Sequence, residues 1–444
     1  MKHLSFTLIL AAMSMLPADV LSAQTLSLEE AIALGLANNR TVANAALQVD
    51  KADHDIATAR SYRLPSFKID TQASQLLKPV DISFNRGAFG ELPGVGPVPA
   101  TDTVIRTPAQ LNLLITAEAQ QPLTHLIKVN LNVHLSEASK AYQREVLRDA
   151  RLGLVDEIRR VYYAIGQTRA ALDANLKSLA LLQELNRVVA TRVSQQVALK
   201  TDSLSVQQRI AQTEVSNVAL RNSLASQKEQ LNELIGRDLR TSFDVVALPE
   251  TTIEQIDLSA AQGRAVDARP DVKQARVKLE QAELSRRVAK ADYIPEIGIA
   301  VRYMSPINID GAPSQIATAA IKASWEPWDW GRRGRAVASK DIEIHQARNN
   351  VRETEERALL EVNTRFRKLE EMRVQLRAAR VGQEAARENV RIRLTQYDVQ
   401  AALLSDVLQT QSSLADSDSQ YQQALAAFWT ARADFERALG EDTK

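Results

Sequence analysis

The 444-residue sequence contains no cysteine. Without thiols the chain can form neither a disulfide nor a thiolate metal ligand, and it lacks the residue on which bacterial lipoproteins are acylated. Glycine and proline are also scarce, with 15 and 14 residues, and aromatic residues make up only 5%. Few residues are therefore available to interrupt helices, and the composition is typical of long helices rather than of a large rounded core.

Net charge and long hydrophobic runs are absent as well. The formal charge is +1, so overall electrostatics provides no attraction for nucleic acid. Residues 1–23 combine Lys2 with an apolar run and the small residues Ser22 and Ala23, which indicates a secretory signal peptide. No later run approaches the ~18 apolar residues of a membrane helix, so any membrane insertion is expected to use strands.

Residue patterns for catalysis, cofactors or metals are also missing. The five histidines are scattered, and none lies at a ligand spacing with carboxylates: His3, His54, His125, His134 and His345. The chain has no glycine-rich phosphate-binding loop, and its many acidic residues on helices are explained as solvated faces. We therefore predict no enzyme activity, no cofactor and no metal site.

What the sequence does contain is a duplication. LKTDSLSVQ at Leu199–Gln207 and LLSDVLQTQ at Leu403–Gln411 share the pattern L-x-[ST]-D-x-L-x-x-Q. A second pair of related stretches, ANNRTV and DARPDV, lies 230 residues apart. The similarity covers almost the whole chain, which is too long a unit for a solenoid of short modules. We predict two structural repeats, 24–248 and 249–444.

Each repeat has the same expected order of elements: a helix, a strand, a loop, a second strand and a helical hairpin. Alternating apolar and polar residues predict strands at about 66–75, 109–121, 296–304 and 315–326. Apolar periodicity predicts leading helices at 28–62 and 258–292, and heptad steps predict helical hairpins at about 123–236 and 331–440. A loop rich in proline and glycine, 76–108, joins the first two strands.

The four strands each have one apolar and one mixed face. This pattern is typical of barrel strands that separate lipid from water. The mixed face carries five charged residues, which we assign to a barrel lumen: Lys68, Asp70, Glu118, Arg302 and Lys322. Four strands cannot close a barrel, because even a filled barrel needs about eight. The chain is therefore expected to oligomerise, and three copies, with twelve strands, would leave an aqueous lumen where two would not.

This order of elements, duplicated behind a signal peptide, resembles the TolC family of outer-membrane efflux proteins. PWDWGRRGRA at Pro327–Ala336 is similar to the family's strand-to-helix signature, P-[LIFW]-[FWY]-[DQ]-x-G followed by basic residues. The two Asp-containing segments resemble the family's periplasmic helical tips. The resemblance implies a mainly α chain with membrane β-strands, forming a homotrimer with a 12-stranded β-barrel continuous with a 12-helix α-barrel.

The function implied by the resemblance is that of an outer-membrane channel in a tripartite efflux or type I secretion system of a Gram-negative bacterium. Such a channel passively conducts substrates out of the cell from an inner-membrane pump of the RND, ABC or MFS type and a periplasmic adaptor protein. It contacts outer-membrane lipid and no nucleic acid, and the lack of cysteine implies no lipidation. The alternative is a soluble periplasmic coiled-coil adaptor or scaffold, which has no use for apolar-faced strands.

Candidate site residues also follow from the resemblance. It implies a pore mouth and gate at Asp202, Asp406 and Tyr397. It implies adaptor docking at the two hairpin tips, with Val197, Ala198, Leu199, Thr201, Ala401, Ala402, Leu403 and Ser405. The simpler alternative for the two Asp residues is that they cap the second helix of each hairpin, which is worth about 1 kcal/mol. Both roles can coexist.

Four positions depart from the family pattern. The family tips often carry a Gly six residues before the Asp, where this chain has Gln196 and Gln400. The best-studied gate has an Arg four residues before the second Asp and another Asp three residues after it, where this chain has Ala402 and Gln409. The gate is therefore expected to be held differently.

The charged cluster next to the signature can be explained without a functional site. Asp329, Arg332, Arg333 and Arg335 lie among tryptophans. A turn that carries interfacial Trp and snorkelling Arg explains them as well as a functional site does.

Overall fold

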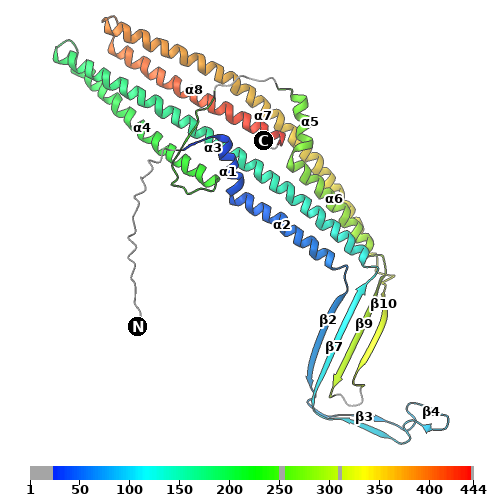
Figure 1. Ribbon diagram of the computed structural model, residues 1–444. Helices are drawn as coiled ribbons and strands as arrows, with labels where there is room; N and C mark the ends of the chain where they lie inside the picture. The colour runs from blue at the N-terminus through cyan, green and yellow to red at the C-terminus, as the bar shows by residue number, and fades with distance from the viewer. Residues whose placement is uncertain (1–23, 250–255, 309–312, 442–444) are drawn as a thin grey trace, which may run out of the picture. The chain divides into compact units, whose positions relative to one another are not determined.

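The computed structural model describes residues 24–249, 256–308 and 313–441. The predicted signal peptide, 1–23, lies outside these residues. The protein is mainly helical with a small amount of strand (Figure 1). The helices are α1 Leu28–Asn38, α2 Arg40–Ser61, α3 Leu126–Ser194, α4 Lys200–Leu234, α5 Leu258–Ala268, α6 Pro270–Ala291, α7 Arg332–Asp398 and α8 Leu404–Leu439.

Each leading helix is broken where the sequence predicted a continuous one. Asn39, between α1 and α2, has an extended backbone, and its Oδ1 accepts a hydrogen bond from the Thr41 amide at 2.9 Å. Asn39 therefore caps α2. Between α5 and α6, Pro270 disfavours helical backbone at Arg269 and serves as the first residue of α6.

The chain divides into two compact units. The first consists of residues up to Ala43, 150–265 and 360 onward, and the second of 44–149 and 266–359. Helices α2, α3, α5 and α7 run through both units. The first unit holds both hairpin tips, and the second holds the main sheet.

The main sheet has four antiparallel strands in the order β10-β9-β7-β2. Their bounds are β2 Ser66–Gln75, β7 Leu111–Pro122, β9 Glu296–Ile307 and β10 Ile316–Ser324. Lys68 pairs with Glu118, and Glu118 pairs with Arg302 on the next strand. Side chains alternate between the two faces of a sheet, so this register places the three residues in one row on one face.

The segment between β2 and β7, which the sequence predicted as a loop, contains a ribbon of its own. Strands β3 Val80–Phe84 and β6 Thr103–Thr107 pair antiparallel, and the short β4 Glu91–Leu92 and β5 Gly96–Pro97 pair beyond them (Figure 1). An ion pair between Arg106 and Asp81, at 2.7 Å, spans β3 and β6. Proline and glycine are therefore concentrated around short strands here rather than in an irregular loop.

In the first unit, the end of α4 packs against the α1–α2 junction. The side-chain Nδ2 of Asn39 donates to the Leu234 carbonyl oxygen at 2.9 Å. Gly236 follows with a φ of +70°, and a Cβ on it would lie 2.8 Å from the Asn38 carbonyl oxygen. Both the backbone conformation and the close approach therefore require glycine at this position. The second-half helices are joined by an apolar cluster in which Phe435 of α8 and Val362 of α7 are buried.

A short strand pair holds the first described residues in place. Strand β1 Gln24–Leu26 pairs in parallel with β8 Phe243–Val245. The hydroxyl of Tyr162 donates to the Leu26 carbonyl oxygen at 2.9 Å and accepts from the Val246 amide at 3.1 Å. Burial raises the pKa of Tyr162 above its usual range, so the hydroxyl remains a donor.

Candidate channel sheet and hairpin tips

The mixed face of the main sheet carries paired charges. Arg302 of β9 lies 2.9 Å from Glu118 of β7, and Lys68 of β2 lies 3.1 Å from Asp70 on the same strand. Lys322 of β10 pairs with Gly298, which puts it on the same face as Arg302. All five charged residues predicted for the lumen therefore share one face of the sheet.

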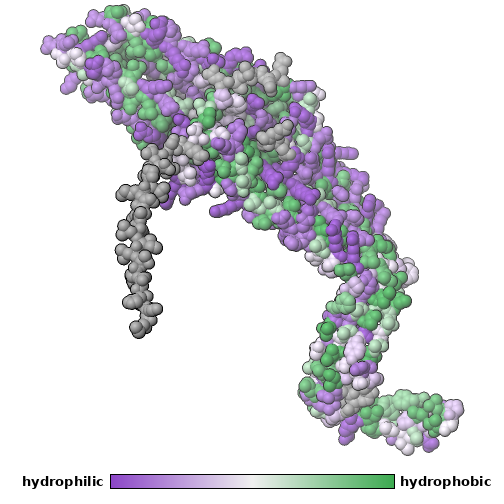
Figure 2. Space-filling view, viewed as in Figure 1, coloured by the Kyte–Doolittle hydropathy of each residue, from purple (hydrophilic) through white to green (hydrophobic). Residues whose placement is uncertain are grey.

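The opposite face is apolar, and the described residues leave it uncovered. It carries Phe67, Ile69, Ile299, Val301 and Ile321, of which Phe67, Ile69 and Ile321 are 75–80% exposed. Figure 2 shows hydrophobic side chains gathered over the strands, while the helices are largely hydrophilic on the same view. Exposed apolar area of this extent is unusual for a surface in water and marks an interaction face.

Both edges of this sheet are open. Strands β2 and β10 each pair on one side only among the described residues. An unpaired edge presents a row of amide and carbonyl groups that can pair with another strand. Both edges of the sheet are therefore able to pair with a further strand.

The two hairpin tips share one backbone motif that the sequence pattern did not reveal. Gln196 and Gln400, the residues that replace the family glycine, have φ values of +57° and +61°. The amide of Val197 donates to the Arg192 carbonyl at 2.9 Å, and that of Ala401 donates to the Gln396 carbonyl at 2.7 Å. Each Gln is therefore the left-handed residue of a Schellman cap, a position that favours glycine.

Apolar side chains project from both tips. Val197, Leu199 and Leu403, three of the predicted docking residues, are 64–70% exposed, and Val399 is equally open. Thr201, Ala401 and Ser405 are exposed, and Ala198 and Ala402 are half-buried. Sequence reasoning missed Val399 because it lies before the repeated Asp segment.

Asp202 and Asp406 occupy the third position of their helices and not the cap itself. Helices α4 and α8 begin after Leu199 and Leu403, neither of which offers a side-chain cap. Asp202 instead reaches back, and its Oδ2 accepts from the Leu199 amide at 3.2 Å. No hydrogen bond or ion pair of the Asp406 carboxylate occurs among the described residues. Of the two residues, only Asp202 therefore helps to cap its helix, and it does so from the third helical position.

Tyr397, the third predicted gate residue, is buried beneath the tips. It packs in an apolar cluster with Leu185, Val206 and Val407, which come from three other helices. The guanidinium of Arg192 on α3 lies over its ring, 4.4 Å from the centroid. This cation–π contact joins the two hairpins, and Arg192 is a site residue that the sequence gave no reason to single out.

The strand-to-helix turn after β10 is held by one acid. Asp329 Oδ2 accepts from Arg333 Nε at 2.6 Å and from the Arg333 amide at 3.0 Å, and Oδ1 accepts from the Gly331 amide at 3.1 Å. These bonds, the side-chain bond from Arg333 foremost, hold the pKa of Asp329 below its usual range. Asp329 thus fixes the first turn of α7 as a charged cap.

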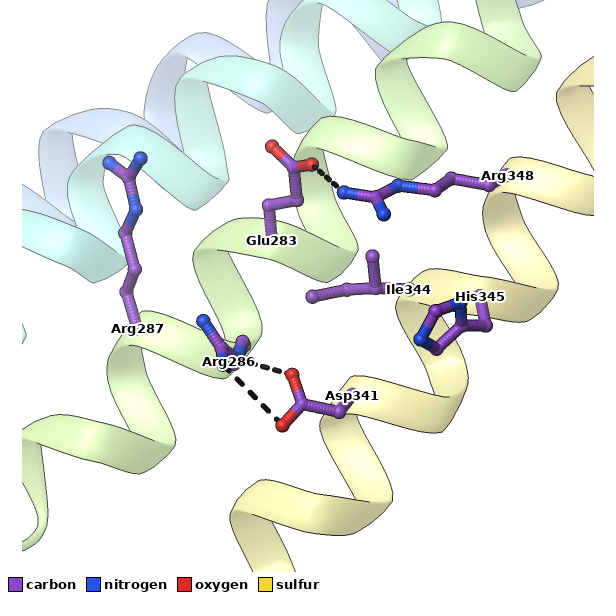
Figure 3. Close-up of a pocket in the computed structure, with 7 residues that line it drawn as sticks. All are labelled: Glu283, Arg286, Arg287, Asp341, Ile344, His345 and Arg348. Carbon is purple, nitrogen blue, oxygen red and sulfur yellow. Dashed lines mark hydrogen bonds and ion pairs between the residues drawn. The ribbon is translucent and has the colours of Figure 1, made fainter.

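A small pocket lies between α6 and α7 in the second unit (Figure 3). Its charges are largely paired, since Arg286 lies 2.5 Å from Asp341 and Arg348 lies 3.5 Å from Glu283. Arg287 points away from these pairs (Figure 3). The pairing leaves little charge to attract an ionic ligand.

Two further features are absent from the described part of the chain. In residues 24–249, 256–308 and 313–441, no group of three His, Cys, Asp or Glu side chains is arranged to hold a metal ion. None of the helices in these ranges combines the length and the apolar character that crossing a membrane requires.

Comparison with known proteins identifies the family. The family model described as "Outer membrane efflux protein" matches residues 31–237 and 262–441. The chain belongs to this family, whose members are transport channels, and it is not an enzyme. An uncharacterized protein of Haemophilus influenzae is 21% identical over 347 residues, which cover 76% of this chain and 70% of that protein.

Solved structures show the same fold. The outer-membrane channel OprN matches with a TM-score of 0.75 and 16% identity, over 93% of this chain and 89% of that one. The outer membrane protein VceC of Vibrio cholerae matches with a TM-score of 0.72 and 16% identity, over 93% and 96% of the two chains. The CmeC outer membrane channel of Campylobacter jejuni matches with a TM-score of 0.75 and 15% identity, over 93% and 85%.

Proposed function

We propose that the protein is the outer-membrane channel of a tripartite efflux or type I secretion system. It passively conducts substrates from an inner-membrane pump of the RND, ABC or MFS type and a periplasmic adaptor out of a Gram-negative cell. The observation that carries this proposal is the main sheet, which has one apolar face, one charged face and two open edges. Such a sheet suits a barrel wall between lipid and water.

The proposed assembly is a homotrimer. Three copies joined β2 to β10 give twelve strands, enough for an aqueous lumen, whereas two copies give eight, whose interior side chains would fill. The same three copies bring together the two helical hairpins of each chain into a 12-helix tunnel that extends into the periplasm. In this arrangement Lys68, Glu118 and Arg302 face the lumen, and residues 24–248 and 249–444 are the two repeats behind a signal peptide at 1–23.

The hairpin tips are the proposed adaptor contact and pore mouth. Support comes from the exposed apolar side chains of Val197, Leu199 and Leu403, which offer a surface for another protein. Trimerisation would bring six carboxylates, from Asp202 and Asp406, around the mouth. A ring of carboxylates favours cations, and its mutual repulsion opposes tight closure.

Tyr397 and Arg192 provide the proposed restraint on the gate. In this chain Ala402 and Gln409 replace the charged partners of the best-studied gate. The contact between Arg192 on α3 and Tyr397 on α7 joins the hairpins at the same level. In this proposal the Arg192–Tyr397 contact replaces those charged partners and holds the second hairpin against the first.

Cell fractionation separates this function from the alternative of a soluble periplasmic scaffold. We expect the mature chain in washed outer membranes, released only by detergent, as a trimer that conducts ions in planar bilayers. Release by osmotic shock or high salt alone, with no conductance from the purified protein, would contradict the channel and favour the scaffold.

A further inference from the structure

The ribbon between β2 and β7 has one apolar face. Residues that pair directly across antiparallel strands project from the same face, and side chains alternate between faces along each strand. The register of β3 with β6 therefore places these residues together: Val80, Ile82, Phe84, Thr103 and Ile105. The ring of Phe89, in the turn after β3, extends the apolar area, since its centroid lies 5.0 Å from that of Phe84. We call Val80, Ile82, Phe84, Phe89 and Ile105 the ribbon face.

The opposite face of the ribbon is more polar. It carries the ion pair between Arg106 and Asp81, with Ser83 on the same face and Val104 as its apolar exception. The ribbon is therefore amphipathic. A strand pair of this kind is typical of a sheet that has water on one side and a packed surface on the other.

The ribbon face is open in this chain. Val80 and Ile82 are 45% and 46% exposed, and Phe89 is 67% exposed. Among the described residues, β3 and β6 pair only with each other, so this part of the ribbon has two strands. A two-stranded ribbon is marginally stable in water unless another surface covers its apolar face. The exposed ribbon face therefore indicates an interaction with a partner.

The position of the ribbon argues against acyl chains as this partner. Strand β2 starts at Ser66, close to the end of α2, and finishes at Gln75, so the ribbon leaves the sheet at the end away from the helices. The 10 residues of β2 are already enough for a tilted strand to cross a hydrocarbon layer. Val80 follows five residues later, and Figure 1 shows the ribbon turned away from the direction of β2 and β7. In the proposed channel the ribbon face thus lies outside the lipid, at the outer mouth of the barrel.

The other copies in the trimer are within reach of the ribbon. The ribbon extends from β2, the edge strand that joins the next copy in the proposed barrel. Twelve tilted strands enclose a barrel with a radius of about 12 Å. The 5 residues of β3 alone span about 17 Å. Each ribbon is therefore long enough to reach the threefold axis, where the same face of all three copies can meet.

We propose that the three ribbons of the trimer pack their ribbon faces against one another across the outer mouth of the barrel and constrict it with apolar side chains. The ion pair of Asp81 and Arg106 then faces the surrounding water. The proposal rests on the proposed trimeric channel. It adds an outer constriction to the proposed gate at the hairpin tips, and this constriction is opened by separating apolar surfaces.

Cysteine cross-linking tests the contact between copies. The chain has no cysteine, so Ile82→Cys introduces one thiol per copy. Three equivalent thiols near the axis can react with a short bismaleimide only in pairs, which leaves one copy free. In outer membranes that hold the full-length trimer, we expect about two thirds of the chains in a two-chain product. The matched control is Ser83→Cys, on the opposite face of the same strand, which should remain as single chains.

Access to the lumen tests the constriction. Ser74 lies near the outer end of β2, on the charged face that the proposed barrel turns inward. A bulky maleimide that does not cross membranes should label Ser74→Cys slowly when it is added to whole cells. Adding Ile82→Asp should speed the labelling at least about tenfold, because an unpaired carboxylate is costly to bury among apolar side chains. Adding Ser83→Asp, which places the same charge on the opposite face, should leave the labelling rate unchanged.

The outcomes separate the ribbon contact from the channel. A trimer that conducts ions but gives no two-chain product from Ile82→Cys would overturn the ribbon contact and leave the channel intact, whether lipopolysaccharide, another protein or water covers the face. Equal yields from Ile82→Cys and Ser83→Cys would overturn it as well, since ribbons that collide at random link through either face. Labelling of Ser74→Cys that is unaffected by Ile82→Asp would overturn the constriction. Loss of both trimer and conductance in the cysteine-free chain would overturn the channel and the ribbon contact together.

Discussion

At the scale of residues, the two tips use glutamine where a glycine is the easier choice. Gln196 and Gln400 adopt left-handed φ values and close Schellman caps at the ends of α3 and α7. A left-handed conformation costs a residue with a side chain about 1–2 kcal/mol. Neither tip gains a side-chain hydrogen bond from its Gln among the described residues. No hydrogen bond of either side chain therefore offsets the strain among the described residues.

The first prediction follows from this strain. Gln196→Gly and Gln400→Gly should each stabilise the protein by about 0.5–1 kcal/mol, because the lower backbone strain exceeds the added freedom of the unfolded chain. The measurement is the midpoint of thermal loss of helical circular dichroism. The matched control is Gln208→Gly in the interior of α4, where the same substitution should cost about 1 kcal/mol. Equal shifts for tip and control variants would contradict the account.

The second prediction concerns the pore mouth. Asp406→Asn removes a carboxylate that has no partner among the described residues, so stability should be unchanged while cation selectivity in planar bilayers falls. Asp202→Asn should act in the same direction, with a small loss of stability because the Leu199 amide donates to this carboxylate. If the double variant kept its selectivity, the carboxylates would not line the mouth.

Residue roles were only partly accessible from the sequence. The repeat singled out Asp202 and Asp406, for which the pore-mouth role stays a prediction. The capping alternative placed them at the start of the helix, whereas each is the third helical residue, because the pattern does not show at which residue the helix begins. Arg192 was missed, since its partner Tyr397 lies on a different hairpin. A contact between residues so distant in sequence produces no local pattern from which it could be predicted.

At the scale of elements, alternation was the most informative pattern. β2 occupies Ser66–Gln75, where a strand at about 66–75 was expected, because Phe67, Ile69, Thr71 and Ala73 alternate with more polar residues. The pattern was less informative between β2 and β7, where the abundance of proline and glycine hid the short β3 and β6. The breaks at Asn39 and Pro270 were also not predicted, since a single cap residue barely changes helical periodicity.

The third prediction tests the two faces of the sheet. Arg at Ile115, Ile299 or Ile321 should hinder assembly, because a cation at mid-membrane on a lipid-facing position costs about 2–4 kcal/mol. Arg at Ser74 or Thr318, which register places on the charged face, should be tolerated. The measurement is the yield of trimer on refolding into detergent. Equal yields for the two groups would refute the assignment of faces.

The fourth prediction concerns the ribbon between β2 and β7. Deleting residues 87–96 removes β4 and most of the turn but leaves the β3–β6 pair. Among the described residues, the backbone hydrogen bonds that join this segment to the rest of the chain stay within the ribbon: Gly87 donates to Pro99, Phe89 donates to Val98, and Gly90 accepts from Val98. A heat-resistant trimer should therefore persist on gels, and its loss would mean that the ribbon tip stabilises the assembly.

At the scale of the whole molecule, the family prediction is confirmed by the match over most of the chain. The order of elements and the duplication carried that prediction, whereas each motif alone was weak. The division into two repeats and the trimer stay predictions. The number of subunits can be inferred from one chain only through geometry. The geometry used for this inference is the sheet, whose two open edges have to be closed.

The same geometry gives the most direct test of the central claim, that three copies close one barrel. Since the chain has no cysteine, the only thiols present are those that are introduced. One cysteine is placed at Gln72 on β2, and a second is placed at each position along β10 in turn. Within one chain these edges are three strand spacings apart, about 14 Å, which is too far for a disulfide. Only contacts between copies can therefore react.

The measurement is the size of the largest disulfide-linked species after oxidation in native outer membranes. The account predicts that some positions on β10 link to Gln72→Cys and that the covalent product stops at three chains. A product that stops at two chains, a ladder that continues beyond three, or no linkage at any position along β10 would contradict it.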